Sequence, residues 1–202
     1  MSSAVQPQTE SPYYLVRLGE MMQKITEEEF FDFCMLNKDW DIERTKEGEI
    51  LIMPPTGGES GHSNFTLIGE LAHWAKKDGT GLGFDSSTNF VLPNKAVRGP
   101  DIAWIRRERW EALKPEERRR FPPICPDFVV ELRSPSDSLK ALKEKMDEYI
   151  TNGALLGWLI DPLQKKVCIY RPDAEVECLE DPASISGDPI LQGFKLDLRS
   201  IW

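Results

Sequence analysis

The sequence predicts one α/β domain in which helices flank a mixed β-sheet. Apolar residues recur at helical spacing in two long segments, at about 60–77 and 137–152. Short apolar runs, the clearest of which is Phe128–Leu132 (FVVEL), indicate buried strands between and around those helices. The chain has 202 residues, 40% of them hydrophobic, which suffices for one ordinary core, and no linker separates two periodic regions.

The N-terminal part predicts an arm followed by a capped helix. Residues 1–20 are expected to form a disordered or loosely docked arm, because the first eleven are polar, and residues 21–202 are expected to form the single domain. Thr26 with Glu29 three residues later predicts a helix N-cap and a capping box. This amphipathic helix is expected to end near Asn37.

The rest of the chain alternates strands with the two long helices. Asp41–Met53 predicts a β-hairpin, and the helix at 60–77 follows it. Ser136 or Asp137 is the expected N-cap of the helix at 137–152. The other predicted strands are Gly81–Phe84, Asn89–Leu92, Gly99–Ile105, Phe128–Leu132, Trp158–Ile160, Val167–Tyr170 and Val176–Leu179.

Charge and cysteine content narrow the classes of function. Thirty-four acidic against 25 basic residues give a net charge of −9, whereas a protein that grips duplex DNA non-specifically usually has a basic surface. The four cysteines form no C-x-x-C pair, so neither thiolate zinc binding nor a disulfide framework is expected. The N-terminus lacks a secretory pattern, and no apolar run approaches the ~20 residues of a membrane span. We therefore expect a reduced, soluble, cytoplasmic protein without a membrane partner.

Two carboxylates are associated with apolar strands. Asp101 follows Pro100 and opens the segment DIAWI, and Glu131 lies inside FVVEL. An ionised carboxylate in a buried strand is costly unless it is paired or bound to a metal. Glu131 paired with Arg133 or with a nearby lysine is one interpretation. The other is that both acids hold Mg²⁺ or Mn²⁺, since hard cations take oxygen ligands.

Longer segments of the chain resemble a known family. PPTGGESG, GPDIAWI and the run from Pro126 to Pro162, together with TEEEFFDF and EGEILIMPP, are similar to the Uma2-like (DUF820) family of the PD-(D/E)XK nuclease superfamily. The resemblance covers roughly residues 25–200. It implies a restriction-endonuclease-like core, dependence on Mg²⁺ or Mn²⁺, and an endonuclease that hydrolyses DNA phosphodiester bonds.

The resemblance also implies roles for individual residues. Asp101 stands at the aspartate of the PD half-motif and Glu131 at the acid of the second half, so both are expected to be catalytic and to bind the metal with the carbonyl of Leu132. The lysine expected two residues after that acid is replaced by Arg133, which stays protonated but can bind a phosphate. The resemblance places the catalytic lysine in the following helix instead, at Lys145, where it would orient water or stabilise charge.

Three of these assignments also have simpler interpretations. The resemblance makes Glu59 a further catalytic acid and metal ligand, direct or through water, but the helix dipole also stabilises a carboxylate at a helix N-terminus. Helical spacing does not choose between Lys145 and Lys143, and either lysine can be a solvated side chain whose stem covers apolar surface. Ser134 is expected to contact phosphate, although its turn first serves to end the strand and begin the helix.

The segment 106–120 is strongly charged, with seven basic residues against four glutamates. It could rest on a DNA backbone with Trp104 or Trp110 available for stacking on bases. A solvated helical excursion is slightly favoured, because charged segments of this kind usually face water.

Three functions stay open at this point. The resemblance favours an endonuclease with DNA as its substrate. The net charge and Arg133 leave open a catalytically inactive relative that serves as a binding or assembly module. The same site chemistry would also suit a metal-dependent phosphoesterase acting on RNA or nucleotides. Cutting both strands of a duplex usually calls for two sites, so a homodimer or higher homo-oligomer is expected, with contacts near Tyr13, Tyr14 and Trp202.

Overall fold

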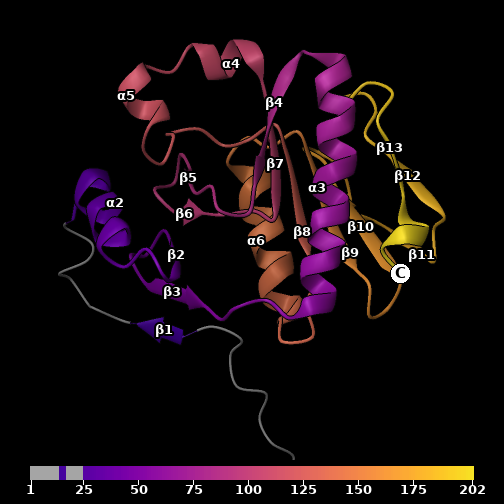
Figure 1. The fold of residues 1–202 in the computed structure, drawn as a ribbon, viewed down its shortest axis with the longest axis horizontal. Coiled ribbons are helices and arrows are strands. Elements are labelled where there is room, and N and C mark those ends of the chain that lie inside the picture. The colour runs from indigo at the N-terminus through magenta and orange to yellow at the C-terminus, as the bar shows by residue number, and fades with distance from the viewer. Residues whose placement is uncertain (1–13, 17–24) are drawn as a thin grey trace, which may run out of the picture.

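The computed structural model describes residues 14–16 and 25–202 and is built around a six-stranded sheet (Figure 1). Its helices are α2 (Glu27–Leu36), α3 (Gly58–Asp78), α4 (Arg107–Glu111), α5 (Pro115–Arg118), α6 (Leu139–Thr151) and the short η1 (Leu198–Ser200). Its strands are β1 (Tyr14–Val16), β2 (Asp41–Arg44), β3 (Ile50–Met53), β4 (Gly81–Asp85), β5 (Phe90–Val91), β6 (Val97–Arg98), β7 (Ile102–Arg106), β8 (Phe128–Leu132), β9 (Leu156–Asp161), β10 (Lys166–Tyr170), β11 (Glu177–Glu180), β12 (Ser184–Ser186) and β13 (Lys195–Asp197).

The six-stranded sheet has the order β11-β10-β9-β8-β7-β4, in which β8 and β9 are parallel and the other neighbours antiparallel. Helix α6 connects the two parallel strands, as a crossover connection requires. This confirms the predicted α/β fold with a mixed sheet flanked by helices.

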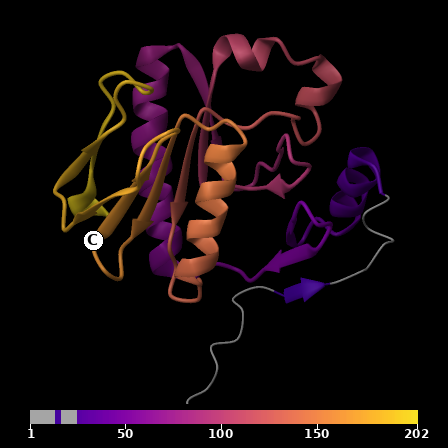
Figure 2. The ribbon, with the colours of Figure 1, turned by 180° about the vertical axis from the view of Figure 1, so that it is seen from behind.

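The two long helices cover opposite faces of this sheet, α3 on one and α6 on the other (Figure 2). Side chains alternate between the faces along each strand. In β7, Trp104 joins the core under α3, and Ala103 joins the core under α6. In β8, Val130 and Leu132 face α3. The side chain of the residue between them therefore points to the α6 face.

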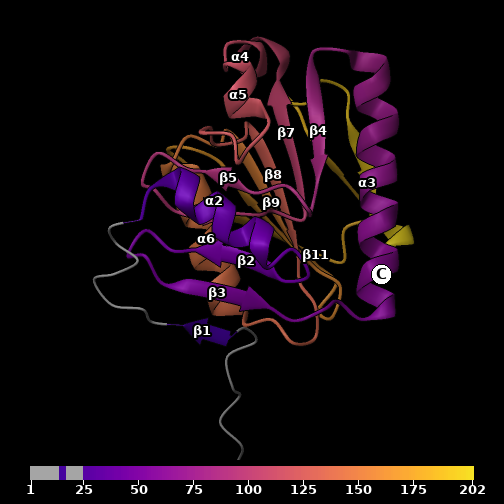
Figure 3. The same cartoon turned by 60° about the vertical axis from the view of Figure 1, so that its left-hand side comes forward.

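A five-stranded sheet of order β1-β3-β2-β6-β5 lies beside the six-stranded sheet (Figure 3). Its small core includes Phe30 from α2, Ile42 and Ile50 from the β2–β3 hairpin, and Val97 from β6. The hairpin leads into α3, which starts near the turn between β8 and α6 (Figure 1). The smaller sheet thus borders the end of the large sheet where β8 stops.

Several local predictions can be compared with the structure. The capping box of α2 is confirmed, since the Thr26 side chain accepts from the Glu29 amide and the Glu29 carboxylate accepts from Thr26 N. The predicted cap of α6 was wrong: Ser138 is the N-cap, and Asp137 accepts a hydrogen bond from Ser134 N instead. Within the predicted arm, residues 14–16 pair with β3, and the rest of that prediction lies outside the described residues.

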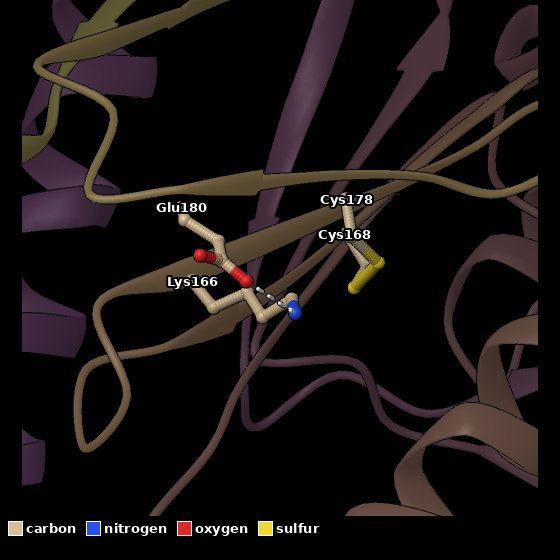
Figure 4. Close-up of a disulfide and its surroundings, with 4 residues drawn as sticks. All are labelled: Lys166, Cys168, Cys178 and Glu180. Atoms are coloured by element: carbon tan, nitrogen blue, oxygen red, sulfur yellow. Dashed lines mark hydrogen bonds and ion pairs between the residues drawn. A yellow bond between two sulfur atoms is a disulfide. The ribbon is translucent and has the colours of Figure 1, made fainter.

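The expectation of uniformly reduced cysteines was wrong for one pair, because Cys168 and Cys178 form a disulfide (Figure 4). They lie directly opposite each other on β10 and β11, with Cα atoms 4.1 Å apart. The same register sets Lys166 opposite Glu180, whose side chains form an ion pair of 3.3 Å. Strand register depends on the folded sheet, so the cysteine spacing alone did not reveal the bond.

Across the described ranges, no helix combines the length and the apolar character that a membrane span needs.

Candidate active site

A cleft of about 1550 Å³ opens where the β2–β3 hairpin, the start of α3, the end of β8 and the first turns of α6 meet. Asp101, Glu131, Lys145 and Glu59 all line it. Four residues that are far apart in the chain are thus brought to one concave surface. Such a surface is where a small number of polar groups can act on a bound ligand.

Asp101 and Glu131 meet because β7 and β8 are antiparallel neighbours. Their antiparallel register pairs Ile102 with Val130. Asp101, the residue before Ile102, therefore lies beside Glu131, the residue after Val130. The Asp101 carboxylate is held in place by the Leu132 amide, which donates to its Oδ2 at 2.7 Å. The two acids are therefore side by side where this edge of the sheet meets the cleft.

Burial changes the acidity of both carboxyls. It raises the pKa of Asp101 to about 6, against the opposing effects of the Leu132 amide and Lys145. It raises the pKa of Glu131 to about 8, although Lys145 favours the ionised form, and the nearby Asp101 and Glu43 add to the rise. For both acids, the cost of burying a charged carboxylate exceeds what the nearby hydrogen-bond donors and Lys145 contribute to the ionised form.

Lys145 approaches Glu131 from the α6 face. Its ammonium lies 2.9 Å from Glu131 Oε1 and 2.7 Å from Glu43 Oε1, and it donates to the Gly99 carbonyl at 3.0 Å. Burial alone would lower the pKa of Lys145, but the two glutamates outweigh burial and raise it, so the lysine stays charged. Lys143, which spacing could not exclude, is exposed on the other side of the helix.

The structure adds Glu43, which the sequence analysis missed. It lies in the middle of β2 and is 2% exposed. Arg98 lies 3.0 Å from its Oε2, and Gly99 N donates to its Oε1 at 2.9 Å. Burial would raise the pKa of Glu43, but Lys145 and Arg98 outweigh burial and lower it. The only sequence signal for Glu43 was its place beside Ile42 in a predicted hairpin strand, and it was weaker than that for Glu131 because Arg44, not an apolar residue, follows Glu43.

Two more residues complete the buried network. Tyr149 on α6 donates to Glu131 Oε1 at 3.0 Å, so this oxygen has both the phenol and the lysine as partners. Glu148 holds Arg98 through Nε at 2.6 Å and accepts from the Asn94 amide at 2.8 Å. Burial and neighbouring acids raise the pKa of Tyr149 far above its ordinary value, so the tyrosine is a neutral donor.

The remaining predicted site residues lie away from this centre or are already engaged. Arg133 forms an ion pair of 2.7 Å with the buried Asp161, so its charge is already compensated. The Ser134 hydroxyl lies 3.0 Å from that of Ser136 in the turn after β8. Glu59 is exposed in the first turn of α3, on the wall of the cleft.

The charged segment 106–120 lies at the opposite end of the sheet from the cleft, where α4 and α5 are found (Figure 1). Many of its cations have intramolecular partners: Arg109 pairs with the buried Asp127 at 3.0 Å, and Arg118 donates to two main-chain carbonyls. Trp104 is 1% exposed and cannot stack on a base. The suggestion that Trp104 stacks on a base was therefore wrong, because Trp104 belongs to the core. Contact of this segment with a DNA backbone, with Trp110 available for stacking, and the slightly favoured solvated excursion both stay predictions.

The donor set of the cleft suits a hard divalent cation. Among the described residues, no three or more His, Cys, Asp or Glu side chains form a ready-made metal cage. Mg²⁺ typically uses only one or two protein carboxylates and keeps other positions for water and phosphate. Glu43, Glu131 and Glu148 are linked through Lys145 and Arg98, and Asp101 lies beside Glu131, so if all six groups are ionised they carry an excess of two negative charges. One divalent ion would balance that excess.

Comparison with known proteins gives one family and one fold. Residues 27–199 match the model of the Uma2 family, described as "putative restriction endonuclease". The fold is similar to a crystal structure from Anabaena variabilis ATCC 29413 described as "a putative nuclease belonging to DUF820", with a TM-score of 0.70 over 88% of this chain and 97% of that chain. The two sequences are 22% identical, so this likeness concerns the fold alone. No curated protein matches the chain.

Proposed function

The chain belongs to the Uma2 family, and from this membership and the geometry of the cleft we propose that it is an endonuclease that hydrolyses DNA phosphodiester bonds with Mg²⁺ or Mn²⁺. The family match and the nuclease neighbour support a nuclease-like function. The observation that carries the finer proposal is the pair of acids, the half-buried Asp101 and the buried Glu131, beside the ammonium of Lys145.

Asp101 and Glu131 would hold the cation, together with the carbonyl of Leu132. The Leu132 amide points at Asp101, and in a β-strand the N–H and C=O of one residue point to the same side, so this carbonyl is directed there too. Glu59 would contribute from the cleft wall, directly or through water. The ion would supply polarisation of the scissile phosphate and a lower pKa for the attacking water.

The protein's own groups fix the acids in orientation. Tyr149 and Lys145 both engage Oε1 of Glu131, and the Leu132 amide engages Oδ2 of Asp101. Within the described residues, the second oxygen of each carboxylate accepts no hydrogen bond from the protein, which leaves it available to a ligand. Lys145 remains protonated and so cannot take a proton from water at neutral pH. Its role in this proposal is to stabilise negative charge on the phosphate.

The proposal is tested by incubating the protein with plasmid, linear duplex, single-stranded DNA and RNA, with Mn²⁺ or with a chelator. Asp101→Asn and Glu131→Gln preserve side-chain size but remove the charge, so each is expected to lower cleavage by at least about 100-fold. Glu180→Gln, an exposed acid on β11, is the matched control and should retain activity. Undiminished cleavage by Asp101→Asn, or cleavage that resists the chelator, would contradict the proposal.

A second candidate, a phosphoesterase acting on RNA or nucleotides, is favoured by the charge of the cleft. Eleven acidic and four basic residues line it. Arg98, Arg133 and Lys145 are paired with buried acids, and Lys46 lies 3.8 Å from Glu47. A long duplex is normally gripped through Lys and Arg contacts to many phosphates. Preferential cleavage of RNA or of a short diester in the same assay would support this candidate.

A further inference from the structure

The ammonium of Lys145 has all three of its hydrogen-bond donors in use. An ammonium group offers three N–H bonds and no acceptor. The three acceptors within 3.0 Å are Oε1 of Glu43, Oε1 of Glu131 and the carbonyl of Gly99. The lysine side chain is 14% exposed, so little water competes for these donors. The closest of the three contacts is the one to Glu43, at 2.7 Å.

Glu43 is itself held on both oxygens. Oε1 also accepts from the Gly99 amide, and Oε2 accepts from Arg98, whose guanidinium is fixed in turn by Glu148. This makes Glu43 a rigid anionic acceptor rather than a mobile counter-ion. Glu43 belongs to β2 in the smaller sheet, whereas Glu131 belongs to β8 of the large sheet, Asp101 directly precedes β7 of that sheet, and Lys145 belongs to its covering helix α6.

We propose that Glu43 is a positioning residue that anchors Lys145 beside Glu131 in the nuclease reaction. The proposal rests on the function proposed above. Lys145 and Tyr149 engage Oε1 of Glu131, which leaves Oε2 for a cation, but a cation bound there would draw negative charge away from Oε1 and weaken its hold on the lysine. With Glu43 present, Lys145 keeps a second, buried anionic partner when Glu131 binds the cation. Without Glu43, the flexible four-carbon stem would leave the ammonium free to turn out of the site.

The placement of the ammonium can be measured without any substrate. Ammonium protons of lysine exchange quickly with water unless hydrogen bonds and burial protect them, so NMR of protein labelled at lysine Nζ detects protected lysines. A protected signal that disappears in Lys145→Met identifies Lys145. The proposal predicts that Glu43→Gln, which keeps the shape but not the charge, loses this signal. Glu180→Gln removes one acidic charge from the edge strand β11, where Glu180 pairs with Lys166, and it should keep the signal.

Kinetics then show whether the anchor matters for the reaction. Glu43→Gln is expected to lower kcat about 10- to 100-fold, as misplacement of a reacting group does, with KM changed less than twofold. Glu180→Gln, on the edge strand β11, is expected to change kcat less than threefold. If Glu43→Gln does not fold by thermal unfolding, Glu43→Asp replaces it, because the shorter side chain withdraws the carboxylate from Lys145 but keeps the charge for Arg98.

Each result decides the proposal. Loss of the signal together with a fall in kcat supports it. A retained signal, with or without a fall in kcat, overturns it, as does a lost signal with unchanged kcat. If the parent protein cleaves no phosphodiester, the proposed function fails, while the signal in Glu43→Gln still decides whether Glu43 anchors the lysine.

Discussion

At the scale of residues, the two acids at the centre differ from ordinary surface carboxylates in their affinity for protons. Burial raises the pKa of Asp101 to about 6 and that of Glu131 to about 8. At pH 7, Asp101 is therefore mostly ionised and Glu131 mostly protonated. A cation that binds the carboxylates of both Asp101 and Glu131 must displace the proton from Glu131, so metal binding and proton release are coupled.

This coupling makes a prediction for calorimetry with Mn²⁺. Between pH 6 and 8 the affinity is expected to rise about tenfold per pH unit, because one proton competes with the metal in this window. Titrations in buffers of different ionisation enthalpy should show about one proton released at pH 7. In Glu131→Gln, both the affinity and its pH dependence should be lost. Equal affinity at pH 6 and pH 8 would contradict the assignment, and no binding at any pH would favour the inactive binding module.

At the scale of elements, the sequence predicted the strands and helices that carry the site but not all of their contacts. Apolar runs located β7 and β8, and they singled out Asp101 directly before β7 and Glu131 within β8. The resemblance selected Lys145 on α6, and the structure turns that side chain toward Glu131. The positions of these elements, and of Lys145 beside Glu131, were predictable because they depend on local periodicity and on a long matching segment, and the catalytic roles stay predictions.

Contacts between distant elements were not predictable in the same way. Glu43 and Lys145 are about one hundred residues apart in sequence, and their meeting depends on how the small sheet borders the large one. The disulfide depends on the register of β10 with β11. Arg133, expected to be free for a phosphate, has Asp161 as its partner because β8 and β9 end side by side. Tertiary neighbours, rather than residue type, decided these cases.

At the scale of the whole molecule, positive charge and the cleft are separated. The basic residues of 106–120 lie at one end of the large sheet, and the cleft with its eleven acidic and four basic residues lies at the other (Figure 1). The net charge of −9 is consistent with a protein that does not wrap duplex DNA. Under the proposed function, substrate contacts near the cleft would therefore depend on a bound cation, on main-chain amides and on neutral side chains.

The separation of the basic residues from the cleft predicts that the rate of cleavage depends only weakly on salt concentration. At fixed Mn²⁺, a plot of log kcat/KM against log [KCl] for a duplex substrate is expected to have a slope no steeper than about −2, because few phosphates are neutralised by the protein. The minimal diester bis(p-nitrophenyl) phosphate is the control for effects of salt on catalysis itself. A slope steeper than about −5 would mean that many Lys and Arg side chains grip the backbone, contrary to the charges of the cleft.

The central claim is that Asp101 and Glu131 jointly hold one divalent cation next to Lys145. Its most direct test is a crystal structure of the protein grown with Mn²⁺, with the metal located from its anomalous scattering. The account predicts one peak within about 2–2.5 Å of a carboxylate oxygen from each acid, with Lys145 still bonded to Glu43. An occupied manganese site elsewhere, with no peak between these two carboxylates, would contradict it.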